Sequence, residues 1–324
     1  MRKMFGGEYD MKYTLKKFIS TVVTLVVVSL CVFLAFNVLP GDPAVRMLGL
    51  EASPELIEQT RERMGLNDPL LVRYFRWFFA FLQGDFGTSY SYSVSVASLI
   101  VKKIPITLTL GLLAFLFTVL ISIPLGILTA KYENGILDRT ITVINQVIMA
   151  IPPFFSGILI TFVFGMIFKL FTPGGFISYT DDFGGFLKYL FFPSLAIALP
   201  KVAMTVKMLR GNLIDESGKD YARTAYSRGN NTNGVLYRHV LKNAMIPVIT
   251  FLGMALADMV AGSIVIEQVF NIPGISRILL SSISNRDYPV VEAIIMGIAT
   301  IVIVINFLVD VIYRVIDPRI SIED

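Results

Sequence analysis

Residues 105–130 read PITLTLGLLAFLFTVLISIPLGILTA and contain no charged side chain. A bilayer core of ~30 Å requires about 20 consecutive apolar residues in a helix, so this run is long enough to span one. Its apolar residues are continuous and do not alternate with polar ones, which argues against a transmembrane β-strand. The sequence contains comparable apolar runs at 18–39, 141–168, 186–209, 246–270 and 290–316. We therefore predict an all-α polytopic membrane protein with about six transmembrane helices.

The composition agrees with a membrane protein. Of 324 residues, 55% are hydrophobic and 16% are charged, with a mean hydropathy of +0.70. Soluble domains have about a quarter of their residues charged. The single cysteine, Cys31, excludes an intrachain disulfide and a cysteine-based metal site. Since no basic block is interleaved with aromatic residues in a soluble domain, we expect no nucleic-acid partner.

The first apolar run, 18–39, raises the alternative of a cleaved signal peptide. A signal peptide has an apolar core of about 7–15 residues followed by small residues. This run is longer and ends in Asn37-Val38-Leu39-Pro40-Gly41-Asp42. We therefore expect an uncleaved first span preceded by a cytoplasmic N-terminus at 1–17.

Lysine and arginine residues predict the orientation of the chain. They are concentrated in the N-terminus, in the loop after the second span, in the 210–243 loop and in the C-terminus at 317–324. Because basic residues are retained on the cytoplasmic side, both termini and the 210–243 loop are predicted to be cytoplasmic. The 40–104 segment is then on the outer side, and it is too long for its own basic residues to count in this rule.

The outer segment, 40–104, has its own helical signals. Ser53-Pro54 is typical of an N-cap followed by proline in the first helical turn. From Leu70 to Gly84 the apolar residues recur at helical spacing and form an aromatic stripe. This helix is too short to span a bilayer, so we expect it along the outer interface. A lid over a translocation path is the alternative.

Polar residues within the apolar runs are candidates for a translocation path. Asp258 lies in the middle of the fifth run, where a carboxylate costs ~2.5–3.5 kcal/mol on insertion scales and should face a cavity or a partner. It can line the path and meet the cationic amino end of a peptide, or it can pair with a polar group of a neighbouring subunit. Asn145 and Gln146 precede Pro152-Pro153, where the third span should kink or break. They either line the path or hydrogen-bond between helices.

The 210–243 loop is predicted to form a helix, a glycine stop, a polar turn and a second helix. Tyr221, Thr224 and Ala225 are expected on one face of the first helix. Gly229 can adopt the left-handed conformation that ends a helix. Arg223 and Arg228 offer forked donors to carboxylates of a partner. A rigid lever between two spans and a solvated basic loop both fit this pattern.

Several motifs in this loop resemble a known family. They are Asp-Tyr-x-Arg-Thr-Ala at 220–225, Gly229, Arg238-His239, Asn243-Ala244 and Pro247. They resemble the cytoplasmic loop of binding-protein-dependent ABC importer permeases. Arg223-Thr224-Ala225, where the general pattern has Glu-Ala-Ala, is similar to the dipeptide/oligopeptide/nickel branch. Further matches to that branch are Leu39–Pro43, Met64–Leu70, Gly84–Ser89, Glu267–Phe270, Pro273-Gly274, Arg286–Pro289 and Asp317–Arg319.

The resemblance implies a first, "B"-type, permease with the type I ABC importer fold, which forms half of a translocation pathway for di- or oligopeptides. It implies a coupling helix that docks on an ATPase through Asp220, Tyr221, Arg223, Thr224, Ala225, Arg228 and Gly229. The implied partners are a second homologous permease, two ATP-binding subunits, an extracytoplasmic peptide-binding protein and membrane lipid. The implied location is the inner membrane of a prokaryote.

The sequence has no Gly-x-x-x-x-Gly-Lys-[Ser/Thr] phosphate loop. We therefore expect the chain not to be an enzyme and to bind no cofactor, with ATP and Mg on the partner subunits. A secondary transporter driven by an ion gradient remains an alternative, and uptake that survives ATP depletion would favour it. A nickel-chelate importer of the same branch and a noncatalytic scaffold or sensor also remain open. A membrane enzyme has the least support, because no nucleophile–base set is visible.

Overall fold

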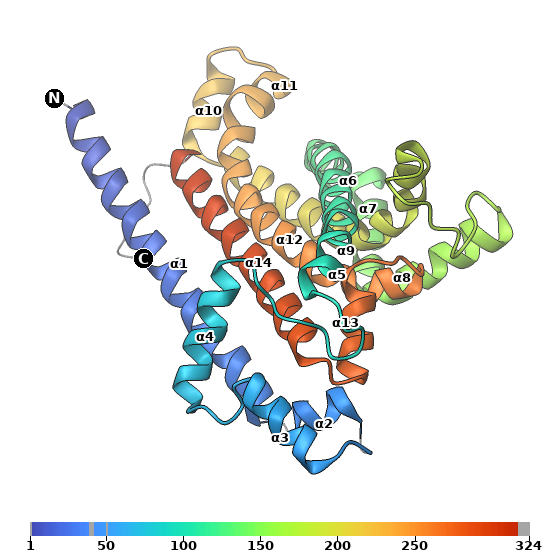
Figure 1. The fold of residues 1–324 in the computed structure, drawn as a ribbon. Helices are drawn as coiled ribbons and strands as arrows, with labels where there is room; N and C mark the ends of the chain where they lie inside the picture. The colour runs from blue at the N-terminus through green and yellow to red at the C-terminus, as the bar shows by residue number, and fades with distance from the viewer. Residues whose placement is uncertain (1, 39–41, 50, 317–324) are drawn as a thin grey trace. The chain divides into compact units, whose positions relative to one another are not determined.

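The computed structural model describes residues 2–38, 42–49 and 51–316. These residues form helices and loops with no sheet, as predicted. Figure 1 shows the helices, whose bounds are α1 Arg2–Val38, α2 Pro43–Leu48, α3 Pro54–Arg63, α4 Leu70–Leu82, α5 Val96–Val101, α6 Ile104–Lys131, α7 Ile136–Ala150, α8 Pro153–Ile160, α9 Phe183–Ser217, α10 Asp220–Ser227, α11 Thr232–Val235, α12 Leu241–Val269, α13 Ile275–Ser284 and α14 Tyr288–Ile316. Two π-helical turns, η1 Thr161–Ile167 and η2 Leu236–Val240, follow α8 and α11. The motif residues at 39–41 and the C-terminus at 317–324 lie outside the described residues.

Within the described residues, five helical stretches are long and apolar enough to cross a membrane, and the bent pair of Ile136–Ala150 (α7) with Pro153–Ile167 (α8 and η1) makes up to six. The five are Leu15–Asn37, Val96–Lys131, Phe183–Ser217, Thr232–Val269 and Tyr288–Val311. This confirms the predicted fold class of about six transmembrane helices.

The third apolar run, 141–168, does not form one continuous helix. Helix α7 ends at Ala150, α8 begins at Pro153, and the two parts are bent by 106°. Pro152 and Pro153 lack the backbone N–H that a continuous helix requires, which explains the break. The break was predicted, but a single span over 141–168 is too simple a description, because a broken span and a re-entrant segment both fit this geometry.

The chain divides into two compact units, which are described separately. The first contains residues 1–106 and 273–303. In it, Tyr74 of α4 packs on Phe33 of α1, and its hydroxyl lies 2.9 Å from the Ser29 hydroxyl. Ser53 caps α3 by accepting a hydrogen bond from the Leu56 N–H, which confirms the predicted start of that helix. Asp287 is fully buried and anchors the loop before α5, accepting bonds from the Ser89 hydroxyl and from the N–H groups of Tyr90 and Ser91.

The second unit, 107–272 and 304–324, is built around α9. This helix packs against α12, α7 and α8, and its buried side includes Leu190, Ala196 and Leu209. Gly126 of α6 allows close approach, because a Cβ there would lie 2.9 Å from the Leu209 side chain. Helix α9 ends at Ser217, eight residues beyond the predicted boundary at Leu209. The polar residues after Leu209 do not stop the helix, since Leu213 is buried on the same side.

Candidate functional site

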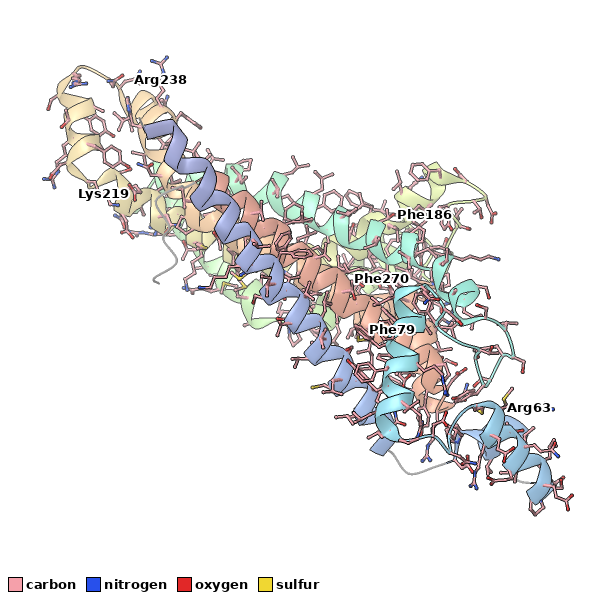
Figure 2. All side chains as sticks on the ribbon, turned by 60° about the vertical axis from the view of Figure 1, so that its left-hand side comes forward. Arg63, Phe79, Phe186, Lys219, Arg238 and Phe270 are labelled. Atoms are coloured by element: carbon pink, nitrogen blue, oxygen red, sulfur yellow. The ribbon has the colours of Figure 1, made fainter. Side chains whose placement is uncertain are left out.

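Helices α10 and α11 form a short hairpin between α9 and α12 at one end of the second unit (Figure 1). Gly229 has a φ of +83°, and its N–H donates to the Tyr226 carbonyl at 2.9 Å. The N–H of Asn230 donates to the Ala225 carbonyl at 3.3 Å. These two bonds form a Schellman motif, which confirms Gly229 as the predicted helix stop. Lys219 and Arg238, which lie just before α10 and on η2, are at this end, far from Phe186 and Phe270 (Figure 2).

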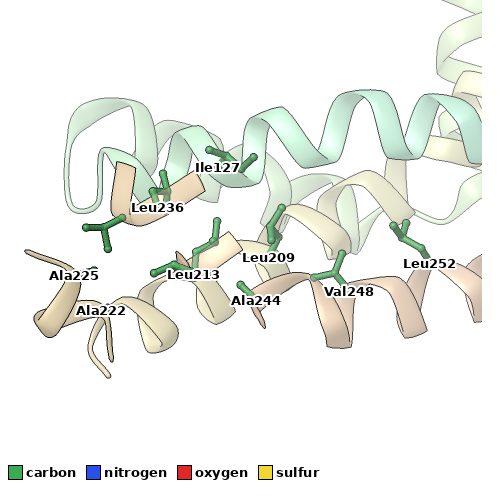
Figure 3. Close-up of a cluster of buried hydrophobic side chains, with 11 residues drawn as sticks. Ile127, Leu209, Leu213, Ala222, Ala225, Leu236, Ala244, Val248 and Leu252 are labelled. Atoms are coloured by element: carbon green, nitrogen blue, oxygen red, sulfur yellow. The ribbon is translucent and has the colours of Figure 1, made fainter. Parts of the chain in front are cut away.

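The hairpin is seated on an apolar cluster of its own chain (Figure 3). Ala222 and Ala225 of α10 are 0% and 5% exposed. They pack in a cluster with residues from α6, α9, α11, η2 and α12, namely Ile127, Leu209, Leu213, Val235, Leu236, Val240, Ala244, Val248 and Leu252. Two alanines bring the α10 backbone close to this cluster. The helix is therefore held to α9, α11 and η2, and through the shared cluster it lies against the same apolar core as the start of α12.

Tyr221, Thr224 and Ala225 lie on one side of α10, as their i, i+3, i+4 spacing predicts, but only part of that side is buried. Ala222, Ala225 and part of Tyr221 point inward, while Thr224 is exposed. At about 100° per residue, Thr224 lies on the far side of Tyr221 from the two alanines. Ala225 thus belongs to the seat of the helix and not to its open surface.

The open surface of α10 is polar. Asp220 and Arg223 have side chains that are 99% and 74% exposed, and their charged groups are 3.7 Å apart. The other exposed residues of the helix and its cap are Thr224, Tyr226, Ser227 and Arg228. Five of the predicted coupling residues therefore lie on or beside one accessible surface, namely Asp220, Arg223, Thr224, Arg228 and Gly229.

Tyr221 links the hairpin to the end of α9. Its hydroxyl donates to Glu216 Oε2 at 2.6 Å, and Lys219 contacts the other oxygen of the same carboxylate. Burial and the neighbouring Glu216 carboxylate raise the pKa of the Tyr221 hydroxyl, so it remains a donor at neutral pH. Glu216 carries no motif signal of its own, so it could not be identified as a functional residue from the sequence.

A second link joins α9 to α7. Arg210 donates to both oxygens of Asp138 at 2.6 and 2.8 Å. Asp138 also accepts a bond from the N–H of Asn134 at 2.9 Å, and its side chain is only 4% exposed. This bidentate pair at the N-terminal turn of α7 holds the two helices in a fixed register.

Asn145 and Gln146 lie beside this pair. Both line a cavity of about 120 Å³ together with Thr129, Thr142, Met149, Val206, Lys207 and Arg210. Asn145 is 7% exposed, whereas Gln146 is exposed. The two residues therefore border a polar cavity between α6, α7 and α9.

Asp258 lies elsewhere in the unit. Its Oδ2 atom accepts a hydrogen bond of 2.8 Å from Lys201 Nζ of α9. The Asp258 side chain is 67% exposed and the Lys201 side chain 23%. We expected either a path-lining carboxylate or one paired with a neighbouring subunit, and the structure places an intrachain partner beside it. A pair this open is worth only about 0–1 kcal/mol.

Lys201 lies inside the fourth apolar run and was not among the residues predicted from the sequence. A cation in the middle of that run and an anion in the middle of the fifth are together a recognisable signal. Lys201 and Lys207 are separated by about 120° around α9. Neither Lys201 nor Asp258 lines the cavity that contains Asn145 and Gln146. The predicted path residues therefore belong to two different polar sites.

The described part of the chain contains no group of three His, Cys, Asp or Glu residues that could hold a metal ion. The candidate sites are thus a polar helix surface at the hairpin, an open ion pair and a small polar cavity. These features can bind partners or solutes but contain no visible reaction centre.

Comparisons with known families match most of the chain. Residues 122–322 match the family described as "Binding-protein-dependent transport system inner membrane component". Residues 10–111 match the N-terminal region described for membrane components of the same kind of transport system. The first match includes the hairpin, the ion pair and the polar cavity.

Curated relatives resemble the chain over nearly its whole length. The oligopeptide transport system permease protein AppB of Bacillus subtilis is 34% identical over 95% of this chain and 99% of its own. The glutathione transport system permease protein GsiC of Salmonella paratyphi A is 34% identical over 96% and 99%. A probable peptide ABC transporter permease protein, y4tP of Sinorhizobium fredii, is 32% identical over 95% and 98%.

Proposed function

This chain belongs to the family of binding-protein-dependent transport system inner membrane components, and from this premise we propose that it couples peptide import to ATP hydrolysis through helix α10. It is a multi-pass inner membrane protein and the permease of an ATP-driven importer, not the ATPase. Its transport system depends on a binding protein and on an ATPase partner. This family membership favours an ATP-driven importer over a secondary transporter driven by an ion gradient.

One observation supports the coupling proposal most directly. Helix α10 packs on α9, α11 and η2, and its buried alanines share an apolar cluster with residues of α12, while its opposite face, with Asp220, Arg223 and Thr224, is polar and open. A partner that displaces α10 would therefore move the ends of two long helices with it. Arg223 and Arg228 suit carboxylates on that partner, because a guanidinium donates two parallel hydrogen bonds.

The proposed topology follows from the distribution of basic residues. Both termini and the hairpin are cytoplasmic, and residues 40–104 lie on the outer side. The spans are near 18–39, 105–130, 141–168, 186–209, 246–270 and 290–316, with the helix boundaries given above. A cytoplasmic hairpin is the arrangement that an ATP-binding partner requires.

We propose peptides as the substrate, because relatives with peptide, oligopeptide and glutathione in their names match the chain over at least 95% of its length. A nickel chelate is the alternative within this branch. The full assembly would contain a second homologous permease, two ATP-binding subunits with their ATP and Mg, and an extracytoplasmic peptide-binding protein. Asp258, Asn145 and Gln146 are the candidate path residues of this half of the pore.

The coupling proposal is tested by reversing one charge on the open face of α10. In the reconstituted complex, Arg223→Glu should lower ATP hydrolysis stimulated by the substrate-loaded binding protein at least about tenfold, since a lost and inverted charge contact of this kind costs more than about 1.4 kcal/mol. The matched control is Arg139→Glu, the same change at an exposed arginine on α7 outside the hairpin. Normal stimulation in Arg223→Glu, or equal loss in both variants, would contradict the proposal.

A further inference from the structure

Helix α12 carries an open stripe along one side. Met254 and Val265 are 51% and 49% exposed, and the Asp258 side chain is 67% exposed. At Gly262, no described atom outside the adjoining backbone of α12 lies within 4 Å of the position that a Cβ would occupy. These four positions recur at helical spacing, so they form one continuous face.

This stripe contains a charge at the depth where charges are most costly. Asp258 lies near the middle of α12 and Lys201 near the middle of α9. Hydrocarbon does not solvate an open carboxylate at that depth, so the stripe faces water or another protein chain. An importer with a shared translocation path between two permeases supplies such an environment.

The ion pair is also easy to open. Lys201 provides the one hydrogen bond that the described residues donate to the Asp258 carboxylate. A single exposed contact contributes little to stability, unlike the bidentate contact of Arg210 with Asp138. A passing ion can therefore replace either partner at low cost. The pair is neutral overall, so a substrate with no net charge meets no net repulsion.

We infer that the Lys201–Asp258 pair lies in the translocation path and binds the charged groups of a passing peptide. Cationic groups of the peptide bind Asp258, and its anionic groups bind Lys201. The inference rests on the proposed peptide-import function. It extends that function by assigning each member of the pair a separate preference. The path then tolerates peptides of either charge because both members are present.

The test is uptake of three tripeptides, one cationic, one neutral and one acidic, by proteoliposomes containing the complete importer and its binding protein. Each rate in a variant is divided by the wild-type rate for the same peptide, so the preference of the binding protein cancels. Asp258→Asn should lower the ratio for the cationic peptide about fivefold or more relative to the acidic one. Lys201→Met should shift the ratios in the opposite direction. Equal ratios for all three peptides in both variants would overturn the inference.

A second measurement leaves the Lys201–Asp258 pair intact and tests whether the open face of α12 is accessible to water and to peptide. In a chain with Cys31→Ser, Gly262→Cys should react with a membrane-impermeant thiol reagent, and bound peptide should slow that reaction. Ala255→Cys, which is 1% exposed on the same helix, is the matched control and should not react. An unreactive Gly262→Cys would overturn the inference. The proposed function fails separately, if the wild-type complex takes up none of the peptides in an ATP-dependent manner.

Discussion

Helix α9 carries two cations that reach neighbouring helices, Arg210 toward its C-terminal end and Lys201 near its middle. Arg210 holds Asp138 with two bonds, and that carboxylate is 4% exposed. Lys201 holds Asp258 with one bond, and that carboxylate is 67% exposed. Leu209 and Leu213, on either side of Arg210 in the sequence, are buried in the apolar cluster under the hairpin, whereas near Lys201 a face of α12 is open.

In the proposed mechanism, this difference separates two tasks of α9. The closed end is proposed to transmit force, because a lever must not deform where it is held. The open middle is proposed to contact the passing substrate, because such a contact requires side chains that are not already fully bonded. Both ion pairs look alike in a list of charges, and only their burial and hydrogen bonding distinguish them.

The largest effect on stability is expected from breaking the closed pair. Asp138→Asn removes the charge that satisfies Arg210 and should lower the free energy of unfolding by about 1.5–3 kcal/mol, the range for hydrogen bonds to charged groups. Thermal unfolding of the complex in detergent measures this change. The matched control is Asp258→Asn, the same substitution in the open pair, which should cost less than about 1 kcal/mol. A larger loss in Asp258→Asn would reverse the comparison.

A smaller effect is expected at the stop of α10. Gly229→Ala introduces a Cβ at a φ of +83°, and this backbone conformation costs roughly 1–2 kcal/mol for an L-residue with a side chain. No described atom beyond Gly229 and its chain neighbours lies within 4 Å of that Cβ, so the cost comes from the backbone alone. Substrate-stimulated ATP hydrolysis by the complex should fall as well, because the end of α10 is then less stable. Gly218→Ala is the control, because Gly218 has a φ of −78° and the added Cβ fits at ordinary contact distances. Equal losses at both glycines would indicate that the Schellman stop is unimportant.

Much of the fold could be predicted from the sequence. Long apolar runs determine membrane helices because burial in hydrocarbon depends on composition more than on detailed packing. Pro152-Pro153, Ser53 and Gly229 could be recognised because each imposes a local backbone constraint that acts within a few residues. These features need no knowledge of the partner helix.

The pairing of charges could not be predicted in the same way. Lys201 and Asp258 are 57 positions apart, and their contact depends on the register of α9 against α12. Arg210 counts as a loop cation in the sequence, although it lies in a helix and holds Asp138. The buried side of α10 could likewise not be predicted, because two alanines carry too little hydrophobicity to mark it. Such contacts follow from packing and not from local pattern.

The proposed coupling is tested most directly by determining on which side of the membrane the open face of α10 lies and which subunit it contacts. A chain with Cys31→Ser and Thr224→Cys is assembled with its partner subunits and treated with a short thiol–amine crosslinker. If α10 couples the permease to its ATPase, residue 224 crosslinks to the ATP-binding subunit, and an impermeant thiol reagent does not label intact cells. Labelling from outside the cell, or an assembled and active complex with no crosslink to that subunit, would contradict it.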